Sequence, residues 1–211
     1  MPLTIYGPAF STYVRTVRLT LAEKNIPYEL EEVNFLQGMP EEHLARHPFG
    51  KVPAINDNGL ELYETFAICR YIDEKYDGPA LQPGDVALRA KMTQIINILD
   101  NYTYNALITR TVIPRVVVPM LGGTTDESVI TGAKAEVEKA LQVLDAIIGD
   151  KEYMVGSELS LADLHFVPIY TYFQLTPDAV PLMEERHNIK RWFNSIKERA
   201  SVKALCPPEL K

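Results

Sequence analysis

The chain has 211 residues, of which 46% are hydrophobic and 23% charged, as in ordinary soluble globular proteins. Its 28 acidic and 21 basic residues give a formal net charge of −7, which argues against a surface for nucleic acid or an anionic membrane. The two cysteines, Cys69 and Cys206, form no Cys-x-x-Cys pair, so neither a disulfide framework nor a zinc site is expected.

The first part of the chain alternates between strand and helix patterns. Residues 3–6 predict a short strand, and apolar residues recur at helical spacing from 11 to 22. A second strand is predicted over 28–35, a short helix or turn over 40–46, and a hairpin of 54–56 and 60–62. A helix over 64–76 completes a β-α-β-α-β-β-α unit, in which the first two strands should pair in parallel.

From residue 78 onward the pattern becomes helical. Pro and Gly residues predict a linker over 78–86, and helical spacing follows over 87–105 and 126–148. The stretch 109–120 is interpreted as helical, with Pro114 and Pro119 expected to kink or break it. Ser160 and Asp163 form a capping-box pattern before a helix that Pro168 should bend, and a last amphipathic helix is predicted over 189–199. We therefore expect an α/β domain at 1–77 and an all-α helical-bundle domain at 87–211.

The most unusual stretch is HPFGKVPAI, residues 47–55, with Glu64 and Thr65 close behind it. Pro53 has no N–H, so it belongs at the first residue or the edge of a strand. A cis bond before it would turn the Val52 backbone outward, where it can pair with an extended peptide ligand. Glu64 and Thr65 begin a helix whose free N–H groups favour a carboxylate. The combination suits a small peptide-like anion.

These motifs resemble the cytosolic glutathione S-transferases, most closely the phi-like members. The resemblance covers nearly the whole chain, through YGPAFS (6–11), HPFGKVPAI (47–55), the Glu64-Thr65 pair, RYIDEKY (70–76), VPMLGGTTD (118–126) and SLADLHFVP (160–168). It implies a thioredoxin-like first domain that carries a glutathione site and a helical domain that bounds an apolar second-substrate site. It also implies glutathione as co-substrate, no metal, and a homodimer.

The resemblance assigns the catalytic role to Ser11. The family's reaction is attack of the glutathione thiolate on a hydrophobic electrophile, and a free thiol with a pKa of about 8.5 is mostly protonated at neutral pH. A hydroxyl donor at a helix N-terminus favours the anion. From the residues alone, Ser11 is more readily an ordinary helix N-cap. Thr12 is the alternative hydroxyl, whereas Tyr6 and Tyr13 are less suitable.

The resemblance also implies the remaining contacts with glutathione. Val52 should pair through its backbone with the cysteinyl part, and cis Pro53 should hold Val52 in place. Glu64 should pair with the γ-glutamyl ammonium, and Thr65 with the carboxylate of the same group. Lys51 is either a partner of the glycine carboxylate or a solvated loop lysine.

Two departures from the phi pattern are expected to weaken glutathione binding. Phe66 stands where phi relatives usually carry arginine, and Met39 and Pro40 stand where they carry basic residues. One charge-assisted contact contributes about 1.5–3 kcal/mol, so its loss weakens binding about tenfold or more. Arg15, His43 and His47 are the residues that would have to compensate.

The second-substrate site is expected to be apolar, although each candidate is about equally compatible with a plain core position. The candidates are Phe10, Tyr13 and Phe35 in the first domain, and Arg115, Val117, Met120, Leu121, Tyr172 and Phe173 in the second. Four further residues carry separate expectations. Asp163 should be a buried capping residue, Phe49 either a core aromatic or a wedge into a partner subunit, Cys69 buried, and Cys206 exposed and reactive.

Three functions are open at this point. The first is a glutathione transferase of the detoxification type. The second is a ligandin-like carrier of apolar molecules, which the Phe66 departure leaves open, and the third is a specialised ether-cleaving or isomerising relative. The expected partners are glutathione, a hydrophobic electrophile or apolar ligand, and a second copy of the chain, with no nucleic acid or membrane. No stretch approaches the roughly 20 apolar residues of a membrane span and no signal-peptide pattern is present, so a cytoplasmic location is expected.

Overall fold

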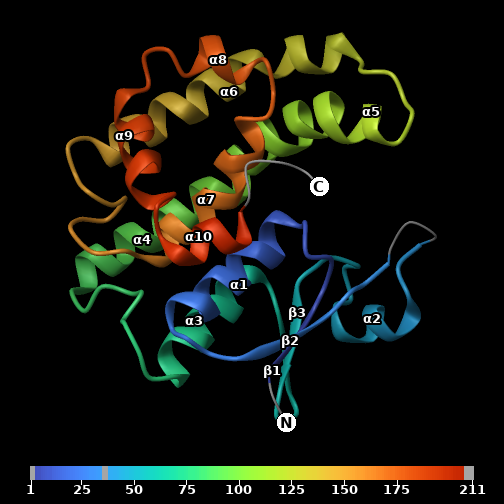
Figure 1. Cartoon of the computed structure of the whole chain (residues 1–211), viewed down its shortest axis with the longest axis vertical. Helices are drawn as coiled ribbons and strands as arrows, with labels where there is room; N and C mark the ends of the chain where they lie inside the picture. Colours follow the sequence, from blue (N-terminus) through green and yellow to red (C-terminus); the bar gives the residue numbers. More distant parts are fainter. Residues whose placement is uncertain (1–2, 35–37, 207–211) are drawn as a thin grey trace. The chain divides into compact units, whose positions relative to one another are not determined.

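The computed structural model describes residues 3–34 and 38–206, and the chain divides into two compact units, Met1–Gln82 and Pro83–Lys211 (Figure 1). The first unit contains a mixed four-stranded sheet in the order β2-β1-β3-β4. β1 (Leu3–Tyr6) pairs in parallel with β2 (Tyr28–Glu31) and antiparallel with β3 (Ala54–Asp57), which pairs antiparallel with β4 (Leu60–Tyr63). The predicted β-α-β-α-β-β-α order and the parallel pairing of the first two strands are confirmed.

The second strand is shorter than predicted. It ends at Glu31, which pairs with Tyr6, the last residue of β1. Because β1 stops there at the Gly7-Pro8 turn, the residues after Glu31 have no strand residue of β1 to pair with. Phe35, predicted at the end of this strand and in the second-substrate site, lies outside the described residues.

The helices of the first unit pack on the sheet and leave its edge strands partly exposed. α1 (Thr12–Glu23) and α3 (Thr65–Lys75) pack against each other, while α2 (Glu41–Arg46) lies on the connection between β2 and β3. Ile5 and Ile55 face each other in the central strand pair and are fully buried. Side chains alternate along a strand, so the next pair, Tyr6 and Ala54, points to the opposite face, where it joins a cluster with Val33.

A buried carboxylate ties the hairpin turn to the end of α3. Asp57 is 2% exposed, and its Oδ2 accepts hydrogen bonds from Tyr71 Oη at 2.8 Å, Lys75 Nζ at 2.6 Å and Tyr76 Oη at 2.7 Å. Burial acts to raise the pKa of Asp57, but the hydrogen bonds from Lys75, Tyr76 and Tyr71 outweigh it and lower the pKa. The carboxylate therefore stays ionised and holds the turn in place.

We expect Asp57→Asn to lower the free energy of unfolding by about 1–3 kcal/mol at neutral pH, because hydrogen bonds to an ionised group are lost. A carboxyl group whose pKa is lowered in the folded chain stabilises it above the unfolded pKa, near 3.8, and loses that contribution as the pH falls through the folded pKa. Urea unfolding of both proteins should show a difference that shrinks between neutral pH and about pH 3. An equal difference at both pH values would contradict this role.

The named elements of the second unit are all helices, joined by loops and an isolated β-bridge between Tyr153 and Gly156. Its elements are α4 (Val86–Ile98), the π-helical segments η1 (Leu99–Thr103) and η2 (Asn105–Val117), α5 (Val118–Met120), α6 (Glu127–Ile148), α7 (Leu161–Phe173), α8 (Ala179–Leu182), α9 (His187–Ile196) and α10 (Ala200–Leu205). The helix predicted over 189–199 corresponds to α9, which begins at His187 and ends at Ile196. The helix α10 that follows it was not predicted.

The two prolines expected to kink or break the 109–120 segment do not interrupt its helical backbone. Pro114 lies inside η2, whose π-helical hydrogen-bond pattern differs from that of the α-helix, in which proline clashes with the carbonyl four residues before it. Pro119 is the second residue of α5, which follows η2 without a break. Pro168 likewise lies within the continuous span of α7.

The predicted capping box at the start of α7 is confirmed, and it lies at the centre of the helical core. Asp163 is fully buried and accepts hydrogen bonds from Ser160 N and Oγ, from Met154 N at 2.9 Å and from Trp192 Nε1 at 2.8 Å. The Trp192 ring stacks on Phe166, with the ring centroids 5.0 Å apart. One carboxylate therefore joins α7, the segment before it and α9.

The environments of the cysteines and of Phe49 differ in part from expectation. Cys69 is fully buried, as predicted, but Cys206 is only 6% exposed, so the prediction of an exposed thiol is wrong. The unpredicted helix α10 carries Cys206 at its end, where its N–H donates to Val202 O. Phe49 is 73% exposed and is therefore not a core aromatic; its contact with a partner subunit stays a prediction.

The described residues contain neither a membrane-spanning helix nor a cluster of metal ligands. Over residues 3–34 and 38–206, no helix combines the length and apolar character required to cross a membrane. Within the same ranges, no group of three or more His, Cys, Asp and Glu side chains is arranged to hold a metal ion.

Candidate active site

The strand register of the first unit brings the predicted glutathione-binding segments to one end of the sheet. Tyr6 pairs with Ala54, and Ala54 pairs with Tyr63. The residues that follow Tyr6, precede Ala54 and follow Tyr63 therefore emerge side by side. These residues are Gly7, Pro53 and Glu64, one from each predicted motif.

Gly7 allows the first of these segments to lie against the second. Its φ is +146°, and a Cβ there would lie 2.6 Å from Val14 Cγ2 and 3.1 Å from Val52 Cβ. Only glycine tolerates this approach. The turn that leads to Ser11 therefore lies directly against Val52.

Ser11 occupies the N-cap position of α1 and is half-buried. Its Oγ accepts a long hydrogen bond of 3.5 Å from Val14 N, which leaves the hydroxyl proton available for donation. The helix dipole favours an anion at this position. Thr12, the alternative hydroxyl, is 5% exposed inside the first turn. Ser11 is thus both a helix cap and an accessible donor.

Two arginines of α1 hold the turn before Ser11. Arg15 Nε and Arg18 Nη1 both donate to the carbonyl oxygen of Ala9, at 3.4 and 3.3 Å. Arg18 Nε also donates to Tyr28 Oη at 2.8 Å. These contacts fix the backbone that presents Ser11.

The second segment contains the predicted cis peptide bond between Val52 and Pro53, which is confirmed. Pro53 is buried and lies directly before β3, whereas Val52 is half-buried and Lys51 is exposed. Within the described ranges, neither the N–H nor the C=O of Val52 has a hydrogen-bond partner. Both groups are free to pair with an extended ligand.

Glu64 adopts a left-handed backbone conformation, with φ +72° and ψ 114°. A residue other than glycine in this region costs about 1–3 kcal/mol, and such residues concentrate at functional sites. The Glu64 side chain is exposed and makes no capping hydrogen bond to α3 within the described residues, while Thr65 is buried at the first position of the helix. The carboxylate is therefore available to a cationic ligand group.

The residues expected to compensate for the missing arginine at position 66 are all buried. Arg15 is 6% exposed, His43 1% and His47 3%. Burial lowers the pKa of His47, although the Glu64 carboxylate partly opposes this shift. None of the three supplies an exposed positive charge near Glu64.

The candidates for the second-substrate site differ widely in exposure. Phe10 (58%), Met120 (65%) and Leu121 (71%) are exposed, Val117 is 37% exposed, and Tyr13 is half-buried. Tyr172 and Phe173, at 7% and 0%, instead belong to the buried core of the helical unit. Exposed apolar side chains that can meet a ligand thus remain next to Ser11 and around α5.

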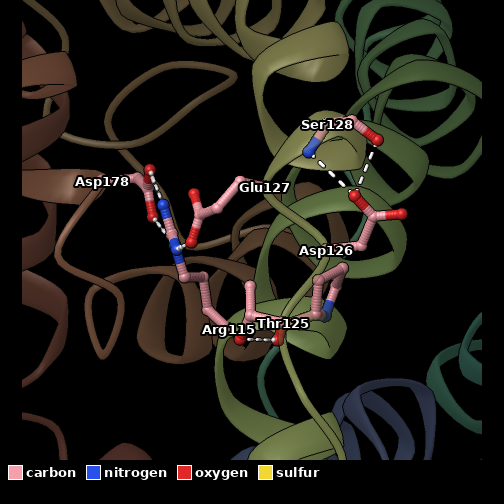
Figure 2. A network of polar contacts seen from close by, with 7 residues as sticks. Arg115, Thr125, Asp126, Glu127, Ser128 and Asp178 are labelled. Atoms are coloured by element: carbon pink, nitrogen blue, oxygen red, sulfur yellow. Dashed lines mark hydrogen bonds and ion pairs between the residues drawn. The ribbon is translucent and has the colours of Figure 1, made fainter.

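Arg115 takes part in an ion-pair network instead of presenting a free side chain. Its Nε donates to Asp178 Oδ2 at 2.7 Å and its Nη2 to Asp178 Oδ1 at 3.2 Å, while Nη1 pairs with Glu127 (Figure 2). Thr125 Oγ1 also donates to the carbonyl oxygen of Pro114 at 2.9 Å. Arg115 therefore ties η2 to the start of α6 and to the segment before α8, a role that its sequence position did not reveal.

Comparison with known proteins places both halves of the chain among one group of enzymes. The family model described as "Glutathione S-transferase, N-terminal domain" matches residues 5–80, and the one described as "Glutathione S-transferase, C-terminal domain" matches residues 99–200.

Curated relatives and solved structures of this group match over nearly the full length. The probable glutathione S-transferase GSTF1 of Oryza sativa is 33% identical, covering 97% of this chain and 95% of that protein. The crystal structure of glutathione transferase F2 from Populus trichocarpa has a TM-score of 0.88 at 30% identity, with 97% of each chain covered. A structure of glutathione S-transferase-I bound with lactoylglutathione has a TM-score of 0.88 at 32% identity, covering 99% of this chain and 100% of that one.

Proposed function

Because the chain belongs to the glutathione S-transferase family, in its phi class, we propose that the hydroxyl of Ser11 is its catalytic group. The protein is an enzyme, a glutathione S-transferase, and glutathione is its co-substrate. The observation that carries the proposal is the accessible hydroxyl of Ser11 at the N-terminus of α1, beside the unpaired backbone of Val52.

In the proposed mechanism, Ser11 donates its hydroxyl proton as a hydrogen bond to the glutathione sulfur and stabilises the thiolate. The thiol proton passes to solvent, the thiolate forms a bond to an electrophilic carbon, and the leaving group departs with the electron pair of its bond. Together with the helix dipole, the donor lowers the pKa of the bound thiol and raises the thiolate fraction at neutral pH. Ser11 forms no covalent bond in this scheme.

Glutathione is held by the sheet end described above. The Val52 N–H and C=O pair with the cysteinyl backbone, and Pro53 supports Val52 from the buried side. Glu64 accepts from the γ-glutamyl ammonium, Thr65 binds the carboxylate of the same group, and Lys51 pairs with the glycine carboxylate. The exposure of Glu64 and Lys51 and the unpaired Val52 backbone support these assignments.

The remaining assignments concern the electrophile and the setting of the enzyme. The exposure of Phe10, Val117, Met120 and Leu121 supports a role for them in binding a hydrophobic electrophile. We also propose domains at 1–77 and 87–211 joined by a linker at 78–86, a homodimer, and a cytoplasmic location. The division into compact units between residues 82 and 83 supports the linker.

Glu64→Gln tests the glutathione site. The exchange keeps the size of the side chain but removes its charge, so the Kd for glutathione should rise about tenfold through loss of a charge-assisted hydrogen bond. Isothermal titration calorimetry measures the change. Glu61→Gln, which alters an exposed carboxylate on β4, is the matched control and should leave the Kd unchanged. Equal affinities of wild type and Glu64→Gln would remove Glu64 from the site, and no binding by wild type would overturn the site as a whole.

A further inference from the structure

A buried histidine of α2 touches the proposed glutathione-binding backbone. His43 is 1% exposed, and its Nε2 lies 2.8 Å from the carbonyl oxygen of Lys51. A carbonyl oxygen only accepts, so Nε2 must carry the proton and donate. Among the described residues the buried Nδ1 has no hydrogen-bond partner, so the ring makes its hydrogen bond to the Lys51 carbonyl through Nε2.

This hydrogen bond acts on Val52 because Lys51 and Val52 share one peptide unit. Their bond is not among the cis peptide bonds of the described residues, so it is trans. A planar trans peptide directs its C=O and its N–H to opposite sides. Since the Lys51 carbonyl points toward His43, the Val52 N–H points away from α2, and it cannot turn without breaking the His43 bond.

The backbone between His43 and Lys51 is itself fixed by a short series of hydrogen bonds. The His47 N–H donates to the His43 carbonyl at 2.8 Å, and the Gly50 N–H donates to the His47 carbonyl at 2.8 Å. The His47 ring packs against Tyr63 of β4, with the centroids 4.7 Å apart. The main chain of His43 is thus held by the His47 N–H, while the Nε2 atom of its ring holds the Lys51 carbonyl.

We propose that His43 is a positioning residue for glutathione, which orients the Lys51–Val52 peptide so that the Val52 N–H meets the cysteinyl carbonyl. The inference rests on the proposed function, because it requires that Val52 pairs with glutathione. His43 is buried and contacts the Lys51–Val52 peptide, so it does not touch the glutathione sulfur in this scheme. It should therefore affect glutathione binding and leave the ionisation of the bound thiol, which is assigned to Ser11, unchanged.

His43→Phe removes the donor and keeps a buried ring of similar size. The KM and Kd for glutathione should rise about five- to tenfold, because the Lys51 carbonyl loses its partner and the peptide is free to turn. The kcat at saturating glutathione and the pKa of the bound thiol should stay at wild-type values. His43→Gln, which offers an amide N–H to the same carbonyl, should restore the KM to within about twofold.

Thr20→Val is the control for a general loss of stability. Thr20 is fully buried in α1 and donates to Thr16 O at 3.0 Å, so this exchange removes a buried hydrogen bond of the same unit that does not involve Lys51. The positioning role is supported if the KM for glutathione rises in His43→Phe but stays near the wild-type value in both His43→Gln and Thr20→Val. A wild-type KM in His43→Phe, an equal rise in Thr20→Val, or no rescue by glutamine overturns it. Glu64→Gln is measured alongside to separate failure of the His43 proposal from failure of the proposed function. If the proposed function is wrong, Glu64→Gln has no effect or the wild type does not bind glutathione. If only the His43 proposal is wrong, the wild type binds glutathione and Glu64→Gln still weakens binding.

Discussion

Ser11→Ala is expected to lower the rate of glutathione conjugation at neutral pH by about 10²-fold, a loss typical for removal of one donor to a developing or stabilised anion. Without the hydroxyl, the pKa of the bound thiol should return toward the value of about 8.5 for a free thiol. Each unit of that pKa change corresponds to about 1.4 kcal/mol of lost thiolate stabilisation. The conjugation rate and the thiolate absorbance, both followed against pH, measure the effect.

The same substitution removes a helix cap, so stability and chemistry must be separated. Ser11→Gly provides this separation, because glycine at an N-cap costs only a few tenths of a kcal/mol while the hydroxyl is equally absent. Thr12→Val deletes the neighbouring hydroxyl, which is buried, and should leave the rate unchanged. If Ser11→Gly retained wild-type activity, or if Thr12→Val lost it, Ser11 would be only the cap of α1.

Asp163→Ala is expected to cause the largest loss of stability, about 3–5 kcal/mol, because several buried donors lose their acceptor at once. The donors are the N–H groups of Met154 and Ser160, the Ser160 hydroxyl and Trp192 Nε1. Asp163→Asn should be nearly as damaging, since its amide NH₂ would face donors in place of an acceptor. Trp192, the only tryptophan of the chain, reports unfolding by fluorescence in urea.

Ser160→Ala serves as the comparison for Asp163. It removes one member of the capping box and should cost about 1 kcal/mol, the usual cost of losing an N-cap. If Asp163→Ala were no more destabilising than Ser160→Ala, the carboxylate would be a local helix cap rather than the link between α7 and α9.

Much of the first unit could be predicted because local rules determine it. Gly7-Pro8, the turn around Gly59 and the position of Pro53 mark the ends of strands, and the order of elements then fixes parallel pairing of β1 and β2. The end of β2 could not be predicted, because it depends on where the neighbouring strand stops. Likewise, no sequence pattern signals that Glu64 adopts a positive φ.

The less predictable features depend on contacts between distant residues or on a change of helical pitch. The hydrogen bond of His43 to Lys51 requires α2 to fold back over the following turn, and the pairing of Arg115 with Asp178 joins residues 63 apart in sequence. Apolar spacing identified a helix near Pro114 but not its π-helical form, because the expected period assumes the α-helical turn. The burial of Cys206 follows from a helix that was not predicted at all.

The strand register that brings Gly7, Pro53 and Glu64 together affects which substitutions this sequence can accumulate during evolution. Groups of the main chain, such as the Val52 peptide, follow the path of the backbone, and many side-chain exchanges leave that path intact. Relatives with only about a third of their residues in common, such as the rice protein at 33% identity, can therefore keep the backbone that we propose to bind glutathione. Phe10, Met120 and Leu121, which we propose to contact the electrophile, are exposed side chains. An exchange at any of them changes the surface that meets the electrophile directly. Preference for the electrophile should consequently diverge faster among descendants of this chain than the use of glutathione.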